Sequence, residues 1–228
     1  MNRIEVKNIR TRYDYSEYYW LIDGKPITVY LDEWKQSSSD ALFNTGSLLG
    51  LLPAWSGELE WQWENDFVWE LIDGPKDLNI PILVCEDDCD LSCIVIMVHI
   101  RRTDSSVFWD RIGILDHSGR SPEEEQQSGI LLLNAYTDED WALYGDNIAT
   151  EKYGSPEYWN WVSENCYEEH IRRLRNYVKP YMQKEENIKW LRETGWEFDR
   201  EEYTAAVGKF RELKNSHQHR KPETQGSK

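Results

Sequence analysis

The sequence predicts an α+β protein, with a mostly antiparallel β-sheet over about residues 3–135 followed by a C-terminal group of helices packed on or beside it. Apolar runs separated by turn residues fill the first half of the chain, and the apolar spacing changes from period two to a helical period after residue 155. The 228 residues include 12 Trp and 13 Tyr, so the chain has enough large side chains to bury a core.

The first predicted element pair is a hairpin near the N-terminus. Two apolar runs, Tyr18–Ile22 and Ile27–Leu31, flank the dipeptide Asp23-Gly24. Asp-Gly favours the tight turns that join antiparallel strands. We therefore expect both runs to be strands. The next apolar stretch, 41–52, shows neither the period of two of a strand nor the period of a helix.

Residues 55–90 form the most unusual segment, with four Trp and eleven acidic residues against one base, Lys76. Within it, Leu59, Trp61 and Trp63 alternate with polar or acidic residues. This period of two predicts a strand with a buried aromatic face and an acidic solvent face. Asn65-Asp66 is then the predicted turn, with residues 67–71 as the returning strand, so the rings are expected in the core and the carboxylates in solvent.

Three further strands are predicted over Ile80–Cys85, Cys93–Arg101 and Val107–Leu115. Each is a short run rich in β-branched and aromatic residues, and an acidic turn, Glu86–Asp90, joins the first two. They are expected to form the centre of the sheet. A polar loop over 117–129, a strand over 130–135 and a short helix over 137–144 follow.

The C-terminal third has the spacing and the caps of helices. Ser155-Pro156 is an N-cap followed by an N1 proline, and apolar residues every four positions from Val162 to Val178 predict a long helix ending near Pro180. A second helix is predicted over Gln183–Thr194, with a glycine after it as C-cap. A third is predicted to begin after Asp199, where a capping box is present.

These elements suggest three parts of the chain. We expect a β-rich domain over 1–150, a helical region over 151–214 packed on the same core, and a disordered polar tail over 215–228.

The net charge of −16 narrows the class of partner. A negative surface repels nucleic acid and anionic lipid at long range, and it attracts basic proteins. The predicted partner-binding residues are the acidic side chains nearest the two predicted turns: Glu58, Glu60, Glu64, Asp66, Glu86, Asp87, Asp88 and Asp90. Carboxylate arrays can also take the place of phosphates on a protein that normally grips DNA or RNA.

The N-terminus and the cysteines indicate the compartment. Met1–Arg12 is charged throughout and has no apolar signal core, and the longest apolar runs are too short to span a bilayer, so we expect a cytoplasmic protein with no membrane association. Its cysteines are then expected to remain thiols. Cys85, Cys89 and Cys93 follow a C-x3-C-x3-C spacing that matches no common metal motif, so no metal or cofactor is predicted. Cys85 and Cys93 are instead predicted to be small apolar residues in adjoining strands.

Several alternatives remain open from the sequence. The strongest is a metal-dependent hydrolase that holds Mg²⁺ or Ca²⁺ through Asp87, Asp88 and Asp90. A nuclease-like triplet, a Cys166–His170 pair and sugar stacking on tryptophan are weaker, because each rests on a short match. No catalytic residues are predicted.

The composition leads to one preferred function. An acidic cytosolic chain with many aromatic residues and no catalytic motif is similar in general character to bacterial immunity proteins that neutralise basic nuclease toxins. The sequence thus predicts a non-enzymatic immunity protein, antitoxin or inhibitor that docks electrostatically on a basic toxin or nucleic-acid-acting enzyme, with neither the partner nor the oligomeric state specified.

Overall fold

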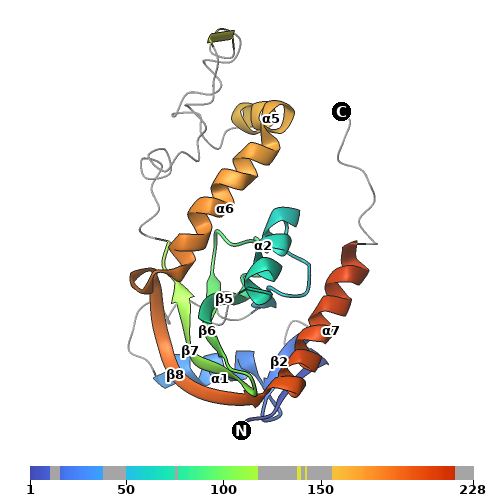
Figure 1. Ribbon diagram of the computed structural model, residues 1–228, viewed down its shortest axis with the longest axis vertical. Coiled ribbons are helices and arrows are strands. Elements are labelled where there is room, and N and C mark those ends of the chain that lie inside the picture. Colours follow the sequence, from blue (N-terminus) through green and yellow to red (C-terminus); the bar gives the residue numbers. More distant parts are fainter. Residues whose placement is uncertain are drawn as a thin grey trace. The chain divides into compact units, whose positions relative to one another are not determined.

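Two antiparallel sheets, with helices that lie mostly in the C-terminal part of the chain, make this an α+β protein, as the sequence predicts (Figure 1). The computed structural model describes residues 1–10, 16–37, 50–74, 77–117, 138–139, 142 and 156–218. The chain divides into two compact units, of which the first comprises Met1–Leu115 with Ile188–Lys228 and the second comprises Asp116–Asn187.

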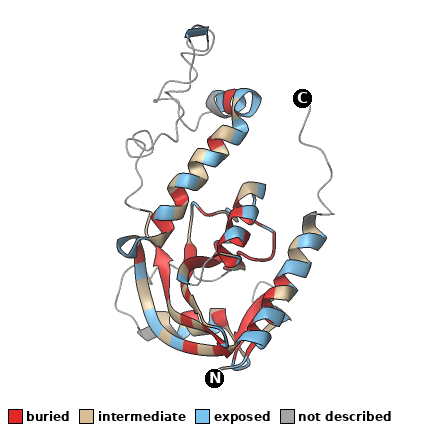
Figure 2. Ribbon diagram, viewed as in Figure 1, coloured by how far each residue is buried: buried red, intermediate tan, exposed pale blue. Residues whose placement is uncertain are grey.

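A five-stranded antiparallel sheet dominates the described part of the first unit. Its strands follow one another in chain order: β4 (Leu52–Pro53), β5 (Asp77–Val84), β6 (Val95–Arg102), β7 (Ser106–Leu115) and β8 (Ile188–Asp199). The three predicted central strands are confirmed as β5, β6 and β7. Residues 80–84 and 95–98 are buried at every position, which is the pattern of strands covered on both faces (Figure 2).

The edge strand β8 corrects the prediction of a second C-terminal helix over Gln183–Thr194. It pairs with β7 from Ser106↔Asp199 to Leu115↔Ile188. Gly195, predicted to cap a helix, has a φ of +56° and lies beside a break in the β7–β8 register, where a bulge needs this conformation. The aromatic and β-branched residues of 188–199 favour a strand and outweigh the propensity of its charged residues for helix.

The first three strands form a smaller sheet: β1 (Ile4–Arg10), β2 (Ser16–Ile22) and β3 (Lys25–Pro26). The predicted Asp23-Gly24 turn is confirmed, because both residues have positive φ between β2 and β3. The predicted strand Ile27–Leu31 is wrong, since α1 (Ile27–Ser37) begins there. Ile27 and Leu31 are both buried, and their spacing of one helical turn fits this helix.

The predicted hairpin around Asn65-Asp66 is also wrong, because residues 62–72 form helix α2 (Gln62–Ile72). Asn65 is buried within this helix and does not turn the chain. Its side chain accepts a hydrogen bond from the Leu59 N–H (3.3 Å) and donates one to the Leu59 carbonyl (3.0 Å). Helical spacing of the buried residues from 64 to 72 thus prevails over the short alternation that precedes it.

Helix α7 (Arg200–Gln218) completes the first unit and begins where the sequence predicts. The Asp199 carboxylate caps it by accepting hydrogen bonds from the backbone N–H groups of Glu201 (2.9 Å) and Glu202 (3.1 Å). Tyr203, Val207 and Phe210 are buried at helical spacing along one face of the helix, and Phe210 is fully buried. Part of the predicted tail is helical, since α7 continues beyond residue 215 to Gln218.

A cluster of aromatic rings forms the core of the first unit. The Trp20 ring lies 4.7 Å from Trp55, 5.5 Å from Trp109 and 4.6 Å from Phe210, measured between ring centroids. These four side chains come from β2, β7, α7 and the turn after β4, and all are fully buried. Large aromatic rings therefore hold the two sheets and α7 together.

The second unit contains two consecutive helices, α5 (Pro156–Asn165) and α6 (Tyr167–Gln183), and a short 3-10 turn, η5 (Glu185–Asn187). The sequence predicts one long helix here, and the chain breaks it at Cys166, whose backbone leaves the helical region. Val162, His170 and Val178 on the predicted stripe are buried. Pro180 lies inside α6, so the helix ends slightly later than predicted.

Several predictions fall wholly or largely outside the described residues. These are the loop 117–129, the strand 130–135, the boundary near residue 150 and the tail beyond residue 218; of the short helix 137–144, residues 138, 139 and 142 are described and are helical. Within the described ranges, no helix has both the length and the apolar character needed to cross a bilayer.

Candidate functional site

The connection between β5 and β6, residues 85–94, carries three cysteines and four acidic residues. The Cys85 N–H donates a hydrogen bond to the Ile94 carbonyl (3.0 Å), which closes the base of the loop. Above it, the Cys89 N–H donates to the Cys85 carbonyl (3.1 Å), and Cys89 adopts a φ of +49°. This loop is called the cysteine loop below.

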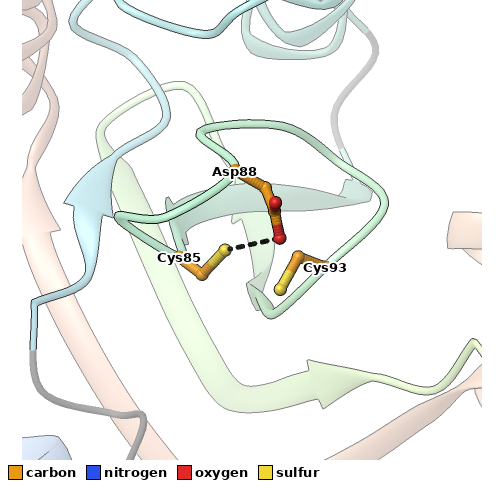
Figure 3. Close-up of side chains that lie close together, drawn as sticks. All are labelled: Cys85, Asp88 and Cys93. Atoms are coloured by element: carbon orange, nitrogen blue, oxygen red, sulfur yellow. Dashed lines mark hydrogen bonds between the residues drawn. The ribbon is translucent and has the colours of Figure 1, made fainter.

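Three potential metal ligands lie together within the cysteine loop (Figure 3). The thiol sulfurs of Cys85 and Cys93 and an Asp88 carboxylate oxygen all lie within 4.8 Å of one another. The Cys85 thiol also donates a hydrogen bond to Asp88 Oδ2 at 3.6 Å. Cys85 is buried, whereas Asp88 is exposed, so the group lies where the sheet meets solvent.

This arrangement corrects the prediction that Cys85 and Cys93 are apolar residues in adjoining strands. Both lie just outside β5 and β6, and their side chains face one another across the base of the loop (Figure 3). The sequence does contain a signal for this contact, because each cysteine adjoins a predicted strand end. Residues at the two ends of a hairpin connection come together whatever the spacing between them.

Burial raises the pKa of two thiols of the cysteine loop, those of Cys93 and Cys89. Burial first, and then hydrogen bonds with Cys85 and Asp88, raise the pKa of the Cys93 thiol to about 12. Burial also raises the pKa of Cys89 to about 11, and nearby negative groups add to the effect. Neither thiol therefore has the lowered pKa of an activated cysteine nucleophile.

The predicted acidic residues gather around the same loop from two segments. The Glu60 N–H donates a hydrogen bond to the Cys89 carbonyl (2.8 Å), which joins residues 58–61 to the cysteine loop. Glu58, Glu60 and Glu86 all act electrostatically on the Cys89 thiol. The structure thus brings together three predicted partner-binding residues that are separated by up to 28 positions in the sequence.

Two predicted residues have other surroundings. Glu64 is only 3% exposed, so the prediction that it lies on a solvent face is wrong. Its carboxylate accepts a hydrogen bond from the Leu91 N–H (3.2 Å), which holds this part of the cysteine loop against α2. Asp66 is exposed on α2, where it forms an ion pair with Lys214 of α7 (3.0 Å).

The remaining loop acids do not form one ligand group. Asp90 accepts hydrogen bonds from the Ser92 N–H and hydroxyl, both at 2.8 Å, and Asp87 is exposed. Among the described residues, the group of three or more potential ligands combines Asp88 with the two cysteines and includes neither Asp87 nor Asp90. The geometry therefore favours sulfur-rich coordination over the alternative site formed by Asp87, Asp88 and Asp90.

The four tryptophans of the segment have different environments. Trp55 and Trp69 are buried, Trp63 is half-buried, and Trp61 is 50% exposed. Trp61 immediately precedes α2 and directly follows Glu60, one of the three acids that act on the Cys89 thiol. The sequence prediction missed this exposure because it assigned the residue to the buried face of a strand.

Comparisons with known proteins give no further assignment: no family model, curated protein or solved structure matches the chain.

Proposed function

We propose that this protein binds a basic protein through a surface formed by Trp61 and the carboxylates of Glu58, Glu60 and Glu86, named the acidic surface below. The observation that carries the proposal is the 50% exposed Trp61 ring, which directly follows Glu60, one of the three acids that act on the Cys89 thiol. Aromatic residues at the centre of an interface and charges at its edge are a common arrangement in protein complexes.

The two kinds of residue contribute differently to binding. The carboxylates steer a cationic partner and set the salt dependence of association, because exposed charge pairs add little affinity individually. The Trp61 ring supplies apolar area that only a docked partner covers. Loss of such an aromatic anchor typically costs about 2 kcal/mol, or roughly 30-fold in Kd.

The class of partner follows from the charge. A net charge of −16 disfavours direct contact with nucleic acid and favours a protein that itself carries basic residues. Toxins and enzymes that act on nucleic acids have such surfaces. The proposed role is therefore that of a cytoplasmic inhibitor, of the immunity-protein or antitoxin kind, that neutralises a basic enzyme.

Affinity capture with matched baits tests the proposal. One bait carries Glu58→Gln, Glu60→Gln and Glu86→Gln, and a control bait carries neutralising changes at three exposed acids near the start of α7: Asp104→Asn, Glu201→Gln and Glu202→Gln. The control changes the net charge equally but lies at the opposite end of strand β6, by the β6–β7 turn.

At physiological salt, the wild-type bait and the control bait should both capture the same basic protein, and the test bait should not. Trp61→Ala in the wild-type background should weaken binding of the same protein by roughly 30-fold. Equal retention on the test and control baits, or a captured protein that is itself acidic, would rule out this surface.

A further inference from the structure

We infer that Cys85, Asp88 and Cys93 form a binding site for Zn²⁺ or a chemically similar thiophilic divalent cation. The inference is separate from the acidic surface, since it rests on the side chains inside the cysteine loop and needs no protein partner. It assigns a role to the first and third cysteines of the C-x3-C-x3-C run, whose spacing matches no common metal motif.

The atomic arrangement already approaches that of tetrahedral coordination. Zinc binds thiolate sulfur at about 2.3 Å and carboxylate oxygen at about 2.0 Å, so a sulfur and an oxygen on one tetrahedral ion lie about 3.5 Å apart. Cys85 Sγ and Asp88 Oδ2 lie 3.6 Å apart without any ion. The second sulfur, of Cys93, also lies within 4.8 Å of both of these atoms.

The loop backbone holds these ligands in place before any cation arrives. The Cys85 N–H to Ile94 carbonyl bond joins the two sides of the loop next to both cysteines. Leu91 is buried, and its N–H is held by the Glu64 carboxylate, which fixes the part of the loop that precedes Cys93. A preorganised loop loses less conformational entropy on binding than a flexible one.

The ligand set determines the class of cation. Two sulfurs and one carboxylate suit zinc and other borderline or soft ions, whereas Mg²⁺ and Ca²⁺ require oxygen ligands. Binding converts both thiols to thiolates, and their protons pass to solvent. The nearby carboxylates of Glu58, Glu60 and Glu86 attract the cation to the loop, and the three protein ligands leave a fourth position for water.

Metal titration of the full-length chain tests the inference, with a phosphine reductant present to keep the thiols reduced without binding zinc. The probes are Zn²⁺ in calorimetry and Cd²⁺ in ultraviolet absorption, where thiolate-to-cadmium charge transfer reports sulfur ligation directly. The wild type should bind one equivalent of Zn²⁺ with a Kd of about 1 µM or tighter and develop the charge-transfer band.

Three variants identify the ligands. Cys93→Ser should remove about half of the charge-transfer band and weaken Zn²⁺ binding by at least about 10-fold, and Asp88→Asn should weaken binding by a similar factor while keeping the band. Cys166→Ser, in the second compact unit, is the matched control and should bind as the wild type does.

Either of two results would overturn the inference. One is the absence of Cd²⁺ charge transfer in the wild type, and the other is Zn²⁺ binding that Cys93→Ser and Asp88→Asn leave unchanged. Both residues lie outside the fully buried core, and a circular dichroism spectrum identical to that of the wild type establishes that each variant is folded.

Discussion

Replacement of Asn65 by alanine tests how the chain holds the segment that carries the acidic surface. The Asn65 side chain makes three hydrogen bonds, with the Leu59 N–H, the Leu59 carbonyl and the Trp61 carbonyl (3.3, 3.0 and 3.3 Å). Asn65 is only 1% exposed, so water cannot replace these bonds. The substitution therefore leaves backbone groups of residue 59 without partners in the interior.

The expected cost follows from these contacts. Three lost bonds at about 1 kcal/mol each, less about 0.5 kcal/mol gained because alanine favours helix, give a loss of about 2.5 kcal/mol in the free energy of unfolding. For a unit of this size that loss lowers Tm by roughly 5–10 °C. Urea denaturation followed by tryptophan fluorescence measures the change.

The adjacent residue supplies the control. Asp66→Ala removes an exposed ion pair with Lys214 and should cost less than about 1 kcal/mol. If Asn65→Ala is no more destabilising than Asp66→Ala, the side chain does not hold the segment, and the account of why a helix replaces the predicted hairpin is wrong.

Further predictions concern the sheet and the pH dependence. Gly113→Ala places a Cβ 2.7 Å from the Lys189 carbonyl oxygen, so it should lower the free energy of unfolding by at least about 2 kcal/mol. Gly208→Ala in α7 places its Cβ in open space and should raise the free energy of unfolding by about 0.5–1 kcal/mol, because alanine favours helix. Denaturant titrations measure both changes. The pKa of Glu17 is raised from 4.5 to about 7. Burial is the main cause and the neighbouring Glu58 adds to it, whereas a hydrogen bond from the Tyr18 N–H acts in the opposite direction. The stability that this group contributes is complete below pH 4.5 and is lost as the pH rises through 7. Between pH 5 and 8 the free energy of unfolding of the wild type should therefore fall by about 1 kcal/mol relative to that of Glu17→Gln, after allowance for solvent screening of a half-buried group. Identical pH profiles of the two proteins would contradict this prediction.

The sequence predicts the centre of the fold well because single patterns dominate there. The strands β5, β6 and β7 are near-continuous apolar runs, and α7 begins with an aspartate that caps it. Two elements are mispredicted because two patterns overlap. The alternation that ends at residue 64 hides the helical spacing that begins there, and the charged residues of β8 resemble those of a helix although its aromatic residues pair with β7.

The candidate site is less predictable than the fold, because its contacts depend on tertiary structure. The sequence identifies the acids but cannot show that Glu60 lies against Cys89, since a backbone hydrogen bond between distant segments makes this contact. It also cannot separate exposed Trp61 from buried Trp55 by composition. The contact between Cys85 and Cys93 can be predicted from the hairpin alone, because each cysteine adjoins the end of a predicted strand.

Hydrogen exchange of the full chain, with and without the basic protein that affinity capture identifies, tests the proposed surface most directly. If the acidic surface binds this protein, exchange should slow on binding at residues 58–61 and 85–90 and should not change at 103–105 or 200–202. Protection at the start of α7, with unchanged exchange at 58–61 and 85–90, would show that the partner binds elsewhere.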